Sequence, residues 1–230
     1  FGGFPCNLKD IQNIAEKHNL TIIEDAAHAV GAIYNNKKIG NHGTAVCFSF
    51  HPVKNLAMPT GGLISINHKN HKQFRKTLLA RRWCGITDRI GSEYNVKELG
   101  WNYYMNEFSA VIGLAQLKKL NRLNNIRKNI AKFYDNQIDV EHKTVFNKDC
   151  SYHLYWILVK NRKKFREKMW KAGIETGTHY KPIHTMKMYQ NHTVLLNTER
   201  VGKQIVTIPI HPNLKTFEMD KIVSSINKFA

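Results

Sequence analysis

The chain has 230 residues, 42% of them hydrophobic and 10% aromatic, so it is long and apolar enough to bury a full core. This composition excludes an intrinsically disordered chain, and no apolar run approaches the roughly 18 residues that a membrane-spanning helix needs. The formal net charge of +18 is compatible with an anionic ligand, such as a phosphate cofactor, a nucleotide-linked substrate or nucleic acid, and equally with lysines spread over solvated surfaces. No dense basic run with interleaved aromatic residues occurs, so the charge alone decides little.

The spacing of the cysteines and histidines argues against a metal centre. Cys6, Cys47, Cys84 and Cys150 lie far apart and form no Cys-x-x-Cys pair. This pattern argues against a disulfide framework and fits a cytoplasmic protein kept reduced. None of the 12 histidines forms the i, i+4 pair with an acidic partner that is typical of a helical zinc site. We therefore expect no metal and no membrane association.

The first part of the chain is predicted to be an α/β layer. Asn7 can cap a helix that continues to Asn19, because Asp10 stands three residues further on. Short apolar strands are predicted over 20–24, 45–50 and 62–66. Helices between strands are typical of a mostly parallel sheet, in which ligands bind beyond the carboxyl ends of the strands.

The remaining elements predict a second, smaller unit. A helix over 69–82 and a loop over 85–100 lead into a long amphipathic helix over 106–138, whose apolar positions, Phe108, Val111, Ile112 and Leu117 among them, are predicted to be core. Beyond it, strands are predicted over 152–159, 174–179 and 204–208, and helices over 161–172 and 216–229. The predicted domains are therefore residues 1–135, which include the long linking helix, and residues 136–230.

Asp25 and Lys54 follow two of the predicted strands, and together they point to pyridoxal phosphate (PLP) chemistry. Asp25 ends one apolar run, and Lys54 stands just past the next. A PLP enzyme needs a lysine that holds the cofactor as a Schiff base and an acid that keeps the pyridine nitrogen protonated. A lysine on a solvated loop and an aspartate that caps a following helix are the structural alternatives.

Several segments resemble the DegT/DnrJ/EryC1/StrS family of PLP-dependent aminotransferases, which act on nucleotide-linked keto-sugars. The resemblance begins at EDAAHAVGA (24–32) and FSFHPVKN (48–55) and continues through residues 100–106, 173–184, 197–199 and 208–212. It implies a fold-type-I PLP transferase. Residues 1–135 would then be the C-terminal part of the large PLP-binding domain, and residues 136–230 the small α/β domain.

The resemblance also implies a set of cofactor contacts. Lys54 matches the Schiff-base lysine, and Asp25 matches the acid at the pyridinium nitrogen. His28 takes the position that contacts the ring hydroxyl, and Ser49 matches a hydroxyl on the cofactor phosphate. Asn102 matches an asparagine that reaches the phosphate from the neighbouring subunit, so the resemblance implies a homodimer with shared active sites. His28 and Ser49 remain open to a purely structural role.

Substrate contacts are implied at His51, Tyr180 and His184, although Tyr180 and His184 could equally form a loop pair without a ligand. Where the family often has Thr-Gly-Glu-Gly-Gly after the lysine, this chain has MPTGG (58–62), and Tyr104 replaces a common arginine. Full members of the family begin upstream of Phe1, so the chain is expected to be truncated at its N-terminus.

These residues predict an aminotransferase that moves an amino group, usually from glutamate, to a nucleotide-linked keto-sugar through Lys54. A PLP-dependent sugar dehydratase of the same family is the nearest alternative, but dehydrating relatives carry histidine in place of the lysine. A non-catalytic binding or regulatory module that uses the basic surface is the other alternative. It predicts nucleic-acid affinity that falls steeply with salt.

Overall fold

A computed structural model describes residues 1–190 and 193–230. Two compact units are present, of which one comprises Pro5–Asn121 and the other combines Phe1–Phe4 with Arg122–Ala230. The sequence placed the domain boundary at residue 135, whereas the units divide between residues 121 and 122; both positions lie inside helix α3 (Glu107–Gln137). No helix in the described ranges is long and apolar enough to cross a membrane.

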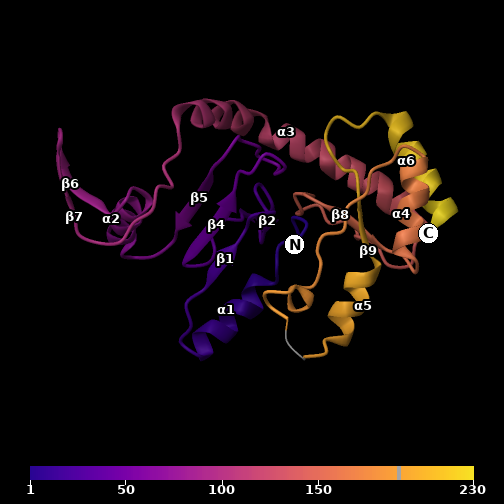
Figure 1. Ribbon diagram of the computed structural model, residues 1–230, viewed down its shortest axis with the longest axis horizontal. Helices are drawn as coiled ribbons and strands as arrows, with labels where there is room; N and C mark the ends of the chain where they lie inside the picture. Colours follow the sequence, from indigo (N-terminus) through magenta and orange to yellow (C-terminus); the bar gives the residue numbers. More distant parts are fainter. Residues whose placement is uncertain (191–192) are drawn as a thin grey trace. The chain divides into compact units, whose positions relative to one another are not determined.

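A three-stranded sheet forms the centre of the unit Pro5–Asn121, with strand order β1 (Ile23–Asp25), β4 (Ala45–Ser49), β5 (Gly62–Ile66) (Figure 1). β1 and β4 are parallel, with Asp25 opposite Cys47, so their carboxyl ends share one edge of the sheet. β5 is antiparallel to β4, which differs from the parallel sheet predicted from the sequence. The connection between them contains no helix, and a parallel return requires a long crossover, usually a helix.

Helix α1 (Leu8–Lys17) precedes β1, and Asn7 caps it by accepting the Asp10 N–H at 3.5 Å, as predicted. The sequence did not predict the two-residue strands β2 (Ile33–Tyr34) and β3 (Lys37–Lys38). Asn35 and Asn36, which join them, have φ values of 47° and 62°, the left-handed region that asparagine tolerates in hairpin turns.

Helix α2 (His71–Arg82) leads into an exposed hairpin of β6 (Ile86–Ile90) and β7 (Glu93–Val96), where the sequence predicted a loop. Close backbone approach fixes the base of the hairpin, since a Cβ on Gly100 would lie 2.0 Å from the Gly85 nitrogen. Most hairpin residues are exposed, so no alternation of buried and exposed positions marks the strands in the sequence.

Helix α3 confirms the long helix predicted over 106–138. The apolar positions in its first half, however, are mostly exposed rather than buried as predicted. Phe108 is 84% exposed and Val111 65% exposed, and Ile112 and Leu117 are exposed as well. Leu120 is buried against Leu56 and Met58. Helical periodicity identifies an apolar face but not what covers it, so the prediction that these positions are core was wrong for most of the first half.

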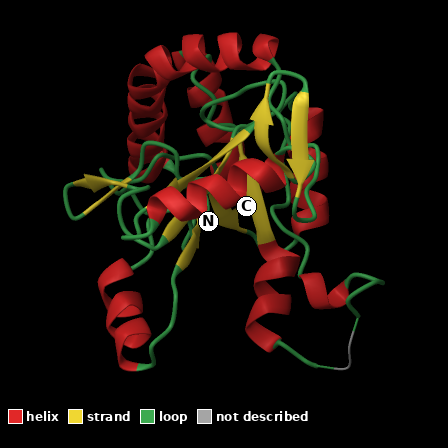
Figure 2. Ribbon diagram, turned by 90° about the vertical axis from the view of Figure 1, so that its left-hand side faces the viewer, coloured by secondary structure: helices red, strands yellow, loops and turns green. Residues whose placement is uncertain are grey.

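The unit Arg122–Ala230 with Phe1–Phe4 contains the antiparallel pair β8 (Tyr155–Leu158) and β9 (Ile205–Ile208) together with helices α4 (Arg162–Lys171) and α6 (Thr216–Phe229), all predicted. Helix α5 (Leu196–Gln204) and the short 3₁₀ helix η1 (Ile183–Thr185) were not predicted. The strand predicted over 174–179 is wrong, because only the single bridge between Gly177 and Thr207 forms there. Both units therefore contain helices and strands, and Figure 2 colours the helices red and the strands yellow.

Tyr134, Tyr155, Ile157, Val206 and Ile226 are fully buried and form the centre of this second core. Beside that core lies the cation Arg127, which donates to the carbonyl oxygens of Tyr152 at 3.4 Å and Ile210 at 2.9 Å. Burial lowers the pKa of Arg127 to about 10. These two hydrogen bonds hold α3 to the segments that flank the β8–β9 pair.

Candidate active site

Asp25 ends β1 at the edge of the sheet where β4 also ends. The Ala26 N–H continues the strand pairing by donating to the Cys47 oxygen at 2.8 Å. One carboxylate oxygen of Asp25, Oδ1, accepts the Ala27 N–H at 3.0 Å, which fixes the side chain in a tight turn. No α-helix follows in residues 26–32, so the alternative that Asp25 caps a helix is excluded.

Lys54 lies in the connection between β4 and β5, and backbone hydrogen bonds fix that connection. The Phe50 N–H donates to Gly61 oxygen, and the Met58 N–H donates to Phe50 oxygen, each at 2.9 Å. Inside the loop thus closed, the Lys54 N–H donates to the His51 oxygen at 2.8 Å. The lysine is therefore presented from an ordered turn rather than from a freely solvated loop.

The charges of Lys54 and Asp25 act on each other. Burial lowers the pKa of the half-buried Lys54 amine below its usual value of 10.5, and the carboxylate of Asp25 opposes this effect by favouring the charged form. Nζ forms no hydrogen bond to any residue in the described part of the chain. A lysine of this kind reaches its neutral, nucleophilic form more easily than a solvated one.

Ser49 and His51 lie between these two groups along the chain. The Ser49 hydroxyl accepts the His51 N–H at 3.3 Å, and the Val53 N–H donates to His51 Nδ1 at 3.4 Å. Ser49 is the last residue of β4 and is half-buried, while His51 is exposed. The structure therefore gathers Asp25, Ser49, His51 and Lys54 at the carboxyl ends of the parallel pair β1–β4.

His28 and Asn102 belong to the same unit as that group. His28 is half-buried in the turn segment that follows Asp25. Asn102 is exposed, forms an isolated bridge with Trp83, and accepts the Tyr104 N–H on its side chain at 3.4 Å. The roles predicted for both residues stay predictions.

Tyr180 and His184 lie in the other unit. Tyr180 is 54% exposed, and its ring stands edge-on to that of Phe1 with a centroid distance of 6.1 Å. His184 is buried, and its Nε2 lies 3.4 Å from Glu199 Oε1. The same glutamate oxygen accepts the Leu195 N–H at 3.2 Å at the start of α5.

Glu199 is a residue whose role the sequence analysis missed, although it lies in the segment 197–199 that carries part of the resemblance. It ties the turn that holds His184 to helix α5. Close packing adds to this link, since a Cβ on Gly202 would lie 2.4 Å from Pro182 Cγ. Within the described residues, no cluster of three or more histidine, cysteine or acidic side chains is arranged to hold a metal ion.

Replacing Glu199 with glutamine should lower stability at neutral pH but not in acid. The pKa of Glu199 is lowered below its usual 4.5, first by the hydrogen bond from the Leu195 N–H and then by His184. A carboxyl whose folded-state pKa is depressed stabilises the fold above its unfolded pKa, and this stabilisation is lost as the pH falls through the folded value. The wild-type protein should therefore have a higher melting temperature than Glu199→Gln at pH 7, and this difference should disappear as the pH falls below about 4.5.

The exposed Glu167 on α4 supplies a matched control with the same charge change. When thermal unfolding is followed by circular dichroism, Glu167→Gln should have the same melting temperature as the wild-type protein, both at pH 7 and in acid. A gap between wild type and Glu199→Gln that persists unchanged into acid would exclude the charge of Glu199 as its cause.

A sequence profile of the DegT/DnrJ/EryC1/StrS aminotransferase family matches residues 1–227. The chain is 33% identical over 245 residues to the UDP-4-amino-4,6-dideoxy-N-acetyl-beta-L-altrosamine transaminase of Campylobacter jejuni, a match that covers 99% of this chain and 64% of that protein. The chain thus spans about 64% of the length of the curated relatives that it matches.

Solved structures superpose closely on the chain. Helicobacter pylori PseC, described as an aminotransferase involved in the biosynthesis of pseudoaminic acid, superposes with a TM-score of 0.90 at 31% identity, over 100% of this chain and 64% of that one. Spr1654 from Streptococcus pneumoniae superposes with a TM-score of 0.91 at 24% identity, over 100% and 66% of the two chains. The predicted fold class, an α/β fold-type-I transferase, is confirmed.

Proposed function

Because the chain belongs to the DegT/DnrJ/EryC1/StrS aminotransferase family, we propose that the protein is a PLP-dependent aminotransferase for a nucleotide-linked keto-sugar. The observation that carries the proposal is the half-buried Lys54, whose pKa is lowered by burial and which interacts electrostatically with Asp25 at the carboxyl ends of β1 and β4. The similarity to the Campylobacter transaminase, which is named for a UDP-linked amino sugar, and to Helicobacter pylori PseC supports a sugar substrate.

The donor groups at this edge of the sheet fit PLP. Lys54 offers an amine for the aldehyde carbon, and Ser49 offers a hydroxyl for the phosphate. Asp25 uses Oδ1 for the Ala27 N–H, which leaves Oδ2 for the ring nitrogen. The strands below approach closely, since a Cβ on Gly62 would lie 2.8 Å from the Phe48 oxygen. When bound, PLP supplies an electron-withdrawing ring that stabilises negative charge at the carbon that loses a proton.

Two residues carry the proton chemistry in this proposal. Asp25 holds a proton on the ring nitrogen, because a carboxylate beside a basic nitrogen favours its protonated form. Lys54 would hold the cofactor through Nζ, and its neutral amine would take up the proton that leaves the α-carbon of the amino donor. The lowered pKa of Lys54 suits this role, since a base acts best when its pKa lies near the working pH.

The other predicted site residues complete the proposal. We propose that His28 contacts the ring hydroxyl and that His51 contacts the substrate; for Tyr180 and His184, which belong to the other unit, substrate contact stays a prediction. Asn102 reaches the cofactor phosphate of a second subunit, which makes the active form a homodimer. The exposure of Asn102 supports this arrangement, as does the uncovered apolar face of α3, where Phe108 is 84% exposed. The four free cysteines support a cytoplasmic location.

The nature of the product tests the proposal. We expect the protein, given PLP, isotope-labelled glutamate and a UDP-linked 4-keto-6-deoxy sugar, to place the labelled nitrogen on the sugar. Mass spectrometry reads this directly. Loss of water from the sugar without gain of nitrogen would instead identify a dehydratase, and an unchanged sugar together with salt-sensitive nucleic-acid binding would favour a non-catalytic module.

A further inference from the structure

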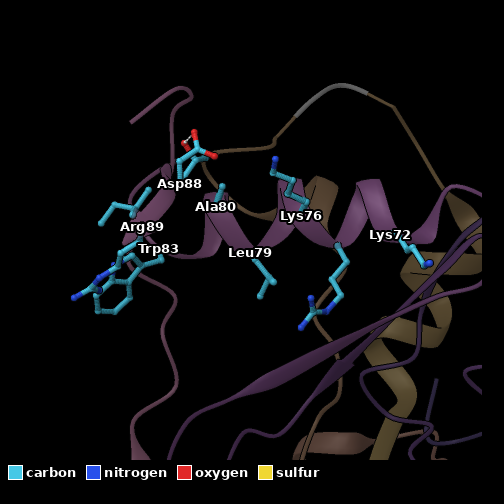
Figure 3. Close-up of a pocket in the computed structure, with 10 residues that line it drawn as sticks. Lys72, Lys76, Leu79, Ala80, Trp83, Asp88 and Arg89 are labelled. Atoms are coloured by element: carbon cyan, nitrogen blue, oxygen red, sulfur yellow. Dashed lines mark hydrogen bonds between the residues drawn. The ribbon is translucent and has the colours of Figure 1, made fainter. Parts of the chain in front are cut away.

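A pocket of about 360 Å³ lies between helix α2 and strand β6, and none of its lining residues belongs to the proposed active site. Lys72, Arg75 and Lys76 line it from one face of α2, because residues three and four apart lie on the same side of a helix. Trp83 follows the end of that helix, and Arg89 lines the pocket from β6. In Figure 3, Lys72 lies toward one end of the helix and Trp83 and Arg89 lie at the other, with Lys76 between them.

Positive charge dominates this pocket. Its only carboxylate belongs to Asp88, which is already paired with Lys97, whose Nζ lies 2.5 Å from Oδ2. Among the described residues, none of the four cations Lys72, Arg75, Lys76 and Arg89 forms an ion pair with a carboxylate. Lys76 acts on Asp88 electrostatically without forming an ion pair, so Asp88 offsets part of its charge. Four cations around a concave surface nevertheless attract an anion.

The positive surface is bounded, which favours a small ligand over a nucleic acid. Beside the pocket, Arg81 Nε pairs with Glu98 Oε2 at 2.7 Å, and Lys97 is held by Asp88. These two ion pairs neutralise Arg81 and Lys97, and Arg82, the next cation on α2, lies over the Tyr104 ring. A strand of nucleic acid needs a continuous basic track, because it carries a charge at every nucleotide.

Apolar groups line the end of the pocket away from Lys72. Leu79 comes from α2, Ile86 from β6, and Trp83 from between them. At 1.5 Å per residue, about 10 Å of helix separates Lys76 from Trp83. One end thus offers lysine and arginine donors, which suit phosphate oxygens, and the other offers an indole and aliphatic groups, which suit a planar body.

We propose that this pocket binds an organic phosphate of nucleotide size, with its phosphates among Lys72, Arg75 and Lys76 and its planar body against Trp83. The only carboxylate that lines the site, Asp88, is held by Lys97, so the site binds its ligand without transforming it. The inference goes beyond the proposed transaminase function, because it requires neither Lys54 nor a cofactor.

A titration with UDP tests the proposal. Calorimetry measures the affinity, and NMR follows the chemical shifts of the Leu79 and Ile86 methyl groups. The wild-type and Lys54→Ala proteins should bind UDP with the same shifts at these methyls, which separates this site from the proposed active site. The pair Arg75→Ala with Lys76→Ala should weaken binding at these methyls by about tenfold or more, since charge-assisted bonds to phosphate are lost. Lys118→Ala with Lys119→Ala, the same charge change on exposed positions of α3, should leave it unchanged.

Two further variants test the charge of the pocket and its contact with the planar body separately. Asp88→Asn removes the only carboxylate and should tighten binding; asparagine also tolerates the left-handed φ of 53° at that position. Trp83→Ala should weaken UDP but not inorganic pyrophosphate. The proposal is overturned if UDP leaves the two methyl signals unmoved, if both lysine-containing pairs weaken binding equally, or if pyrophosphate binds as tightly as UDP.

Discussion

Replacing Lys54 with alanine should reduce amino transfer to the keto-sugar by about a thousandfold or more, because it removes the group proposed both to hold the cofactor and to move the proton. The backbone of Lys54 supports the turn through its N–H to the His51 oxygen, and alanine keeps that bond. Folding should therefore survive the change. Borohydride reduction in the presence of PLP, followed by peptide mass mapping, should find the adduct on Lys54 in the wild-type protein and no adduct in the variant.

Chemical rescue distinguishes proton transfer from a structural role for Lys54. Small primary amines added to Lys54→Ala should restore part of the transfer, and the restored rate should rise with the basicity of the amine, as expected for a general base. Lys54→Arg, which keeps the charge but not a neutral amine, should be inactive and should resist rescue. The exposed Lys69 supplies a control, since Lys69→Ala should transfer normally. Full activity of Lys54→Ala without added amine would rule out the proposed function.

The pair Asp25 and Lys54 could be predicted because each follows a short apolar strand, and because the two strands are parallel neighbours. Parallel pairing brings the carboxyl ends of β1 and β4 to one edge, so two positions far apart in the sequence meet without any further information. The antiparallel return of β5 was not predictable in the same way. It depends on the path of the loop that holds Lys54, which forms backbone hydrogen bonds instead of a helix.

What the sequence analysis missed depends on contacts or exposure rather than on pattern. The strand β6 contains Thr87, Asp88 and Arg89 in succession, which no alternation of apolar residues marks. Glu199 contacts His184 from fifteen residues away, on a helix that was not predicted. Phe108 illustrates the opposite error, since its helical spacing predicted burial and the structure leaves it exposed.

Replacing Asp25 with asparagine should have opposite effects on the free and the cofactor-loaded protein. In the free protein, the carboxylate raises the pKa of Lys54 against the effect of burial. Its removal should therefore lower that pKa further and make the amine more reactive. Peptide mass mapping across a pH series measures how fast an acylating reagent modifies Lys54. The pH at which this rate reaches half its maximum should be lower in Asp25→Asn than in the wild-type protein.

In the loaded protein, the same substitution removes the charge that favours a proton on the ring nitrogen. An opposite charge within about 4–6 Å of a titratable group shifts its pKa by roughly one to three units. The protonated ring nitrogen should become less favoured by the same factor, so amino transfer should fall by about 10- to 1,000-fold. The turn itself should persist, because the side-chain oxygen of asparagine can still accept the Ala27 N–H. Glu93→Gln, the same charge change in the exposed hairpin, should alter neither quantity. The proposed role of Asp25 requires acylation of Lys54 to become faster in the variant while amino transfer becomes slower. A misfolded variant would lose both, so a loss of acylation together with amino transfer would count against the assignment of Asp25.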